Sequence, residues 1–165
     1  MTEEIPDEEL ELEDYINDEE PTLIQTHEKV NSELNGEIIT LEKGYVELRL
    51  TTTPEMIADS IGLIHGGFIF CAADYAAMVA VNEKNVVLVA SDCQFLSPVK
   101  FHDEVNFVAR ARQLEGKKRN VHVVGHVHDI KVFEGEFKTV ITERHVLKLK
   151  LIDGDSKQHG ESGII

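Results

Sequence analysis

Residues 68–81 form an apolar segment that contains a single charged side chain. The segment reads Phe-Ile-Phe-Cys-Ala-Ala-Asp-Tyr-Ala-Ala-Met-Val-Ala-Val, and Asp74 is the only charged residue between Asp59 and Glu83. Apolar residues on every side of a helical projection are typical of a helix that is buried all round. A buried carboxylate costs several kcal/mol unless it is paired or hydrogen-bonded. Asp74 is therefore the first candidate for a functional residue.

Segments with strand-like patterns lie on both sides of this helix, which we expect to run from about residue 66 to 82. The expected strands are 37–41, 45–53, 85–97, 104–115, 120–132 and 137–151. The expected turns are 42–44, 98–103, 116–119 and 134–135. Consecutive strands joined by short turns pair antiparallel. A helix that is apolar on all sides must be wrapped by a curved sheet or covered by a second copy of the chain, so the sequence predicts an α+β fold.

The charge of the chain is concentrated at its N-terminus. The 165 residues carry a net charge of −15, and residues 1–20 hold 11 Asp or Glu and no Lys or Arg. We expect 1–20 to be an acidic, disordered tail, or alternatively an arm that docks a protein partner. Residues 21–152 would form one domain, with a helical extension at 21–35, and residues 153–165 a C-terminal tail. The acidity argues against nucleic acid as a partner, because phosphate binding needs a basic face.

Cysteine and histidine placement gives no sign of a disulfide or a metal centre. Cys71 and Cys93 lie far apart in apolar segments, which is typical of buried thiols in a reducing compartment. No basic leader opens the chain and a carboxylate interrupts its longest apolar stretch, so we expect a cytoplasmic protein without a membrane span. His122, His126 and His128 share one strand face, but the first two would lie about 13 Å apart. We therefore predict no metal site.

Four local motifs together resemble the hotdog-fold thioesterases. They are His65-Gly66-Gly67, a carboxylate nine residues after the His, Phe95-Leu96-Ser97-Pro98-Val99 and Asp103-Glu104-Val105. The likeness spans about residues 37–151 and is strongest to the phenylacetate-pathway and mitochondrion-associated acyl-CoA thioesterases. A looser likeness extends to the hotdog proteins co-regulated with flagella in Campylobacter-like bacteria. The resemblance implies a curved antiparallel sheet around one long helix, and a homodimer or dimer of dimers whose sheets join edge to edge.

The start of the long helix carries the chemistry that a thioesterase needs. A helix N-terminus offers unpaired N–H groups and positive dipole, so Gly66, helped by Gly67, is a candidate oxyanion donor. Asp74 is the candidate general base or nucleophile. His65 either shapes the loop or transfers a proton. Asp59 stands where the resembling enzymes carry Asn, and an ionised Asp cannot donate a hydrogen bond. Either Asp59 is protonated, or it has another role, or hydrolysis is weak.

The resemblance also implies where an acyl-CoA would lie. Its acyl chain would run along the buried helix near Phe68, Tyr75 and Met78, in a site shared between one subunit's glycine loop and the other's helix carboxylate. The densest basic run of the chain is either a solvated hairpin turn or a clamp for the coenzyme A phosphates. Its candidate residues are Lys117, Lys118 and Arg119.

The favoured function is that of an acyl-CoA thioesterase that needs no metal or redox cofactor, with the coenzyme A thioester as its substrate or ligand. The alternative is a non-catalytic protein that binds acyl-CoA or an acyl carrier protein, and Asp59 in place of Asn favours it. A dehydratase of the same fold ranks lower, because those enzymes arrange a catalytic His and a carboxylate differently.

Overall fold

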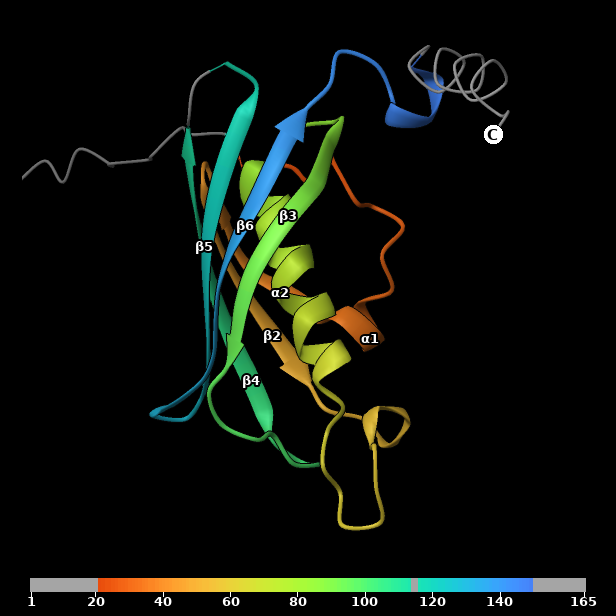
Figure 1. Ribbon diagram of the computed structural model, residues 1–165, viewed down its shortest axis with the longest axis vertical. Coiled ribbons are helices and arrows are strands. Elements are labelled where there is room, and N and C mark those ends of the chain that lie inside the picture. Colours follow the sequence, from red (N-terminus) through yellow and green to blue (C-terminus); the bar gives the residue numbers. More distant parts are fainter. Residues whose placement is uncertain (1–20, 114–115, 150–165) are drawn as a thin grey trace, which may run out of the picture.

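The computed structural model describes residues 21–113 and 116–149, in which one antiparallel sheet wraps around a single long helix (Figure 1). The strand order is β1-β2-β4-β5-β6-β3. The strands are β1 Glu37–Glu42, β2 Tyr45–Thr51, β3 Val86–Phe95, β4 Glu104–Gln113, β5 Lys118–Val127 and β6 Ile130–Ile141. The helices are α1 Ser32–Asn35, α2 Gly66–Val81 and the 3-10 turns η1 Pro54–Met56 and η2 Val146–Lys148. This arrangement confirms the predicted α+β hotdog architecture.

The helix α2 is the centre of the core. Alanines along it, such as Ala72 and Ala76, are fully buried, because strands of the curved sheet pack against them. On β2 the side chains of Val46 and Leu48 face this core, whereas Arg49 is exposed. This confirms the alternation expected for a strand with one solvent-exposed face. In the described part of the chain, no helix is both long enough and apolar enough to cross a membrane.

The turn between β5 and β6 lies at His128–Asp129, so the turn predicted at 134–135 is wrong, as are the strand ends predicted at 132 and 137. The strand end predicted at 151 is also wrong, because β6 ends at Ile141 and the 3-10 turn η2 follows. His128 adopts a positive φ of 49°, a conformation that turns usually assign to Gly or Asn. Gly135 lies within β6, where a β-carbon would come within 2.8 Å of Cys93 Sγ. Gly135 is thus a packing residue, and the glycine misled the turn prediction.

The helix predicted for 21–35 is confined to α1, Ser32–Asn35. The residues before it are held in an irregular path by the side chain of Asn82, the left-handed C-cap of α2. Asn82 Nδ2 donates to Leu23 O at 2.8 Å, and Asn82 Oδ1 accepts from Gln25 N–H at 2.8 Å. These tertiary bonds replace the helical ones. The tails predicted at 1–20 and 153–165 lie outside the described residues.

Candidate active site

Backbone hydrogen bonds fix the loop that leads into α2. The N–H of His65 donates to Met56 O at 2.9 Å, which ties the helix start to η1. The N–H of Ile64 donates to Val99 O at 2.8 Å, which ties it to the segment after β3. The first turn of α2 is therefore held from two sides, and its N–H groups keep one orientation.

Asp59 shapes this loop. Its Oδ1 accepts from the N–H groups of Ile61, Gly62 and Leu63 at 3.0, 2.9 and 3.0 Å. These bonds hold the pKa of the Asp59 carboxyl below its ordinary value, so the carboxylate is ionised at neutral pH, against the protonated alternative. Only one oxygen is used, and an amide oxygen of Asn could accept the same bonds. An Asp at position 59, where the resembling enzymes carry Asn, is thus compatible with the conformation of this loop.

Gly66 and Gly67 present N–H groups at the positive end of α2. The N–H of Phe68 donates to His65 O at 3.1 Å, whereas those of Gly66 and Gly67 donate to no acceptor among the described residues. The His65 ring packs over Gly67, where a β-carbon would come within 2.9 Å of its Nε2. Free donors at a helix N-terminus are suited to hold an oxyanion.

An apolar groove of about 300 Å³ opens beside Gly66. It is lined by Ile64, Ile69, Phe95, Leu96, Val99 and Val132. A second hollow of about 640 Å³ adjoins it past Leu63 and Pro98. In the sequence, residues 95–99 only carry the family resemblance. Their role as groove walls depends on the segment folding back under the loop, which no local pattern indicates.

The residues predicted to contact an acyl chain are not on this groove. Met78 is fully buried and Tyr75 is 9% exposed, and both belong to the core around α2. Phe68 is partly buried at the first turn of the helix, where its ring meets that of His65 edge-on at a centroid distance of 6.2 Å. Their contact with an acyl chain stays a prediction.

Asp74 carries an unsatisfied carboxylate oxygen. Its Oδ1 is buried and has no hydrogen-bond partner among the described residues. Burial raises the pKa of Asp74 from 3.8 to about 6. Burial also raises the pKa of the Cys71 and Cys93 thiols, and the Asp74 charge acts in the same direction on both, at Cys93 after the charge of Asp92. The carboxyl is thus close to both an exposed residue of α2 and a residue of β3, an edge strand of the sheet.

Gly66 and Asp74 cannot meet at one atom within a single subunit. They are eight residues apart on the same helix. At a rise of 1.5 Å per residue, this separation is about 12 Å along the axis. A reacting carbonyl needs its oxyanion donor and its base each within about 3 Å.

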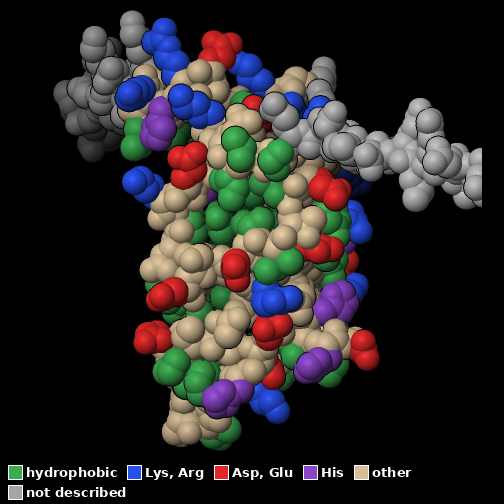
Figure 2. Space-filling model, turned by 180° about the vertical axis from the view of Figure 1, so that it is seen from behind, with side chains coloured by type: hydrophobic (Ala, Val, Ile, Leu, Met, Phe, Trp, Pro, Cys, Tyr) green, Lys and Arg blue, Asp and Glu red, His purple; other side chains and the backbone are tan. Residues whose placement is uncertain are grey.

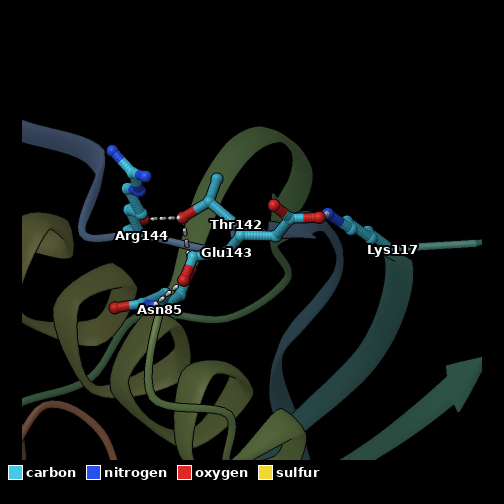
Figure 3. Close-up of polar contacts among 5 residues, drawn as sticks. All are labelled: Asn85, Lys117, Thr142, Glu143 and Arg144. Atoms are coloured by element: carbon cyan, nitrogen blue, oxygen red, sulfur yellow. Dashed lines mark hydrogen bonds and ion pairs between the residues drawn. The ribbon is translucent and has the colours of Figure 1, made fainter. Parts of the chain in front are cut away.

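The basic run 117–119 lies at the other end of the sheet. Lys117 Nζ pairs with Glu143 Oε1 at 2.7 Å (Figure 3), and Arg119 donates to the backbone oxygens of Gly116 and Lys118, each at 2.9 Å. Along β5 this run is about 30 Å from the β5–β6 turn. Residues of that turn line the hollow that adjoins the Gly66 groove. One subunit therefore does not bring the predicted clamp to the helix start.

The three histidines of β5 and its turn do not assemble into a metal centre. His122 Nε2 contacts Glu134 Oε1 at 2.9 Å across the β5–β6 pair. Within residues 21–113 and 116–149, no three His, Cys, Asp or Glu side chains gather as a metal site requires.

Comparison with known proteins places this site in a family. A family model described as the Thioesterase superfamily matches residues 61–133. Cj0977, a sigma28-regulated virulence protein from Campylobacter jejuni, is 42% identical with a TM-score of 0.72, over 74% of this chain and 95% of that one. The chain belongs to the thioesterase superfamily. PH1136 from Pyrococcus horikoshii is 41% identical with a TM-score of 0.75, over 78% of this superfamily member and 98% of PH1136.

Two curated relatives are longer than this member of the thioesterase superfamily. Methylthioribose-1-phosphate isomerase from Aquifex aeolicus is 50% identical over 117 residues, which are 71% of this chain and 26% of that protein. Transcription factor FapR from a Thermoanaerobacter species is 27% identical over 118 residues, which are 71% of this chain and 59% of FapR. The chain spans only part of each, so the activity named for either whole protein does not follow for this one.

Two more distant structures share the fold of this thioesterase-superfamily chain and were solved with a ligand. A hypothetical thioesterase from Streptococcus pneumoniae TIGR4 holds coenzyme A, at 18% identity and a TM-score of 0.61, over 67% of this chain and 88% of that one. The protein smu.793 from Streptococcus mutans UA159 holds acetyl-CoA, at 19% identity and a TM-score of 0.63, over 72% and 97% of the two chains.

Proposed function

We propose that this protein hydrolyses acyl-CoA thioesters, with Asp74 as the general base and the Gly66 N–H as oxyanion donor. The observation that carries the proposal is the buried Asp74 Oδ1 without a hydrogen-bond partner. Burying a polar atom without a hydrogen-bond partner lowers the stability of the fold. A role in the reaction explains why the chain carries such an atom. A carboxylate whose pKa is raised to about 6 is also a better base than an ordinary Asp near neutral pH.

The proposed site is shared by two copies of the chain. Because Gly66 and Asp74 are about 12 Å apart on one rigid helix, the donor must come from a partner subunit. Support comes from β3, a ten-residue strand at the edge of the sheet, in which Val89 is 59% exposed. An open edge of this length pairs readily with another chain. A two-fold pair of β3 strands would build two equal sites.

In the proposed reaction, Asp74 removes a proton from water while the water oxygen attacks the thioester carbon. The carbonyl oxygen becomes an oxyanion held by the N–H groups of Gly66 and Gly67. Collapse of this intermediate breaks the carbon–sulfur bond, and Asp74 returns its proton to the leaving thiolate. The acyl chain would occupy the apolar groove beside Gly66. Two proteins of this fold hold coenzyme A and acetyl-CoA respectively, which supports coenzyme A as the leaving thiol.

The second candidate is a protein that binds acyl-CoA without turning it over. Asp59 favours it, since the carboxylate is ionised and has no proton to donate to a thioester oxygen or to a water. A relative that is named a transcription factor, FapR, also supports a non-enzymatic role for this fold.

Release of free thiol from acyl-CoAs of short, medium and long chain separates the two candidates. Asp74→Asn keeps the shape of the side chain and removes the base, so we expect turnover to fall by roughly 10²–10⁴-fold. Asp129→Asn, in the exposed β5–β6 turn, is the matched control and should keep full activity. Acyl-CoA binding without any thiol release in the wild type would refute hydrolysis and support the binding protein.

A further inference from the structure

A group of cations lies where α2 ends, away from the Gly66 loop. Lys84, Arg144 and Lys148 line a cavity of about 540 Å³. Lys84 also lines an adjoining cavity of about 300 Å³, together with His27 and His145. We call these five residues the basic patch. Figure 2 shows blue side chains gathered at the top of the molecule, with a histidine and a carboxylate among them.

Among the described residues that line the two cavities, Lys and Arg outnumber Asp and Glu. Glu143 is the one carboxylate among the residues that line the two cavities, and it is paired with Lys117 at 2.7 Å. Figure 3 shows the Glu143 carboxylate turned toward Lys117, while the Arg144 guanidinium points away from that pair. No ion pair in the described residues involves Lys84, Arg144 or Lys148. Three cations that have no ion-pair partner in the described part of the chain are suited to bind an anion.

The turn that carries Arg144 is held in place. Thr142 N–H donates to Asn85 O at 3.2 Å, and Asn85 Nδ2 donates to Glu143 O at 3.3 Å. The Thr142 hydroxyl donates to Arg144 O at 2.6 Å. The basic patch is therefore preformed, and a ligand does not have to order its backbone.

The acidic residues 1–20 are tethered beside this patch. Asn82 holds Leu23 and Gln25 at the end of α2, and the next residues, Thr26 and His27, line the smaller cavity with Lys84. An extended chain covers the three residues from Leu23 back to Glu20 in about 10 Å. The 11 carboxylates of residues 1–20 are thus kept at a high effective concentration around the cations.

The composition of residues 1–20 also suits the patch. Residues 8–13 read Glu-Glu-Leu-Glu-Leu-Glu, so carboxylates and leucines alternate. The cations of the patch lie beside apolar side chains on η2, where Leu147 is 76% exposed and Val146 37%. We propose that residues 1–20 dock on the basic patch of their own chain, with carboxylates on Lys84, Arg144 and Lys148. The docked segment keeps other anions off the patch, and salt weakens the contact by screening.

Carbodiimide cross-linking of the full-length protein tests this proposal, because it joins carboxylates to lysine amines that touch. Mass spectrometry should find residues 1–20 linked to Lys84 and Lys148 in preference to Lys100, Lys131 and Lys138. At 1 M salt, where the screening length is about 3 Å, these links should be lost. Arg144→Gln removes a charge and leaves both amines, so it should lower their yield about two- to fivefold. Lys138→Gln, on β6, is the matched control and should not change the yield.

Two outcomes would overturn the proposal. One is an even spread of cross-links over all exposed lysines. The other is found by mixing isotopically heavy and light protein: links that join a heavy residue 1–20 peptide to a light Lys84 peptide would show docking on another chain. A binding measurement with inorganic pyrophosphate adds an independent check. Full-length protein with Glu8, Glu9, Glu11 and Glu13 changed to Gln should bind pyrophosphate several-fold more tightly than wild type, and equal binding would contradict a covered patch.

Discussion

Cys93 Sγ lies 2.8 Å from the position that a β-carbon on Gly135 would occupy. The two residues are direct partners across the β3–β6 pair. The rings of Phe133 and Phe137 close the remaining space, at 3.1 and 3.2 Å from the same position. The edge strand β3 is thus packed closely against β6 at Gly135. A larger residue at this position would displace atoms of the core.

Gly135→Ala should lower the free energy of unfolding by about 1–3 kcal/mol, because the added methyl overpacks the core. The measurement is urea unfolding followed by circular dichroism. Gly135→Ala combined with Cys93→Ala removes the nearest atom and should recover part of the loss relative to Cys93→Ala alone. If the methyl costs the same with and without the Cys93 thiol, the proposed contact is not its cause.

Mixed dimers should reveal a site shared between subunits. Asp74→Ala and Gly66→Pro should each be inactive as pure proteins, because the first lacks the base and the second lacks the N–H that would hold the oxyanion. The first position of a helix accepts Pro, so Gly66→Pro should still fold. After unfolding and refolding of an equal mixture, half of the dimers contain one intact site, so about a quarter of wild-type activity should return. A mixture of Asp74→Ala with Asp74→Asn is the control and should stay inactive. Activity that does not return in the first mixture would contradict the composite site.

The thiol-release rate should depend on the ionisation of Asp74. Because burial raises the pKa of Asp74 to about 6, the base is protonated and inactive at lower pH. We expect kcat/KM to rise tenfold per pH unit below about 6 and to level off above it. Hydrolysis rates from pH 4.5 to 8.5 measure this profile. A rate that is flat across pH 6 would exclude Asp74 as the base.

Asp74 should also make folding stability fall as pH rises. Its folded pKa of about 6 exceeds the ordinary 3.8, so between these values the native state binds more protons than the unfolded state. The contribution of neutral Asp74 to the free energy of unfolding is therefore fully present below about pH 4 and is lost as the pH rises through about 6. Asp74→Asn should therefore be more stable than wild type at pH 7.5, on the order of 1–3 kcal/mol, and equally stable at pH 4. Urea midpoints at the two pH values provide the test.

Asp59→Ala should disturb the loop that positions Gly66. The change removes the acceptor of three N–H groups, so the oxyanion donor loses its orientation and hydrolysis should fall by up to about 10²-fold. Asp59→Asn keeps an acceptor oxygen and should retain the melting temperature of the wild type. Equal hydrolysis rates in Asp59→Ala and wild type would show that the loop does not need this side chain.

Much of the framework follows from local patterns. The apolar run 68–81 predicts α2 because helical periodicity is a property of neighbouring residues. The alternation of Val46, Leu48 and Leu50 predicts β2 for the same reason. Asp74 stands out without any structure, since a carboxylate in an apolar helix is conspicuous by its solvation cost alone. The sequence by itself thus determined the fold class and the residue on which the candidate site rests.

Only the tertiary structure decided what depends on contacts between distant residues. Gly135 reads locally as a turn, but its place within β6 is set by the crowding of Cys93 and two phenylalanines. The role of Asp59 depends on a loop closed by long-range bonds to Met56 and Val99. The basic patch joins Lys84 to Arg144, residues 60 positions apart that chain folding brings to the end of α2. Packing and charge act through space, and their partners are not visible in the order of residues along the chain.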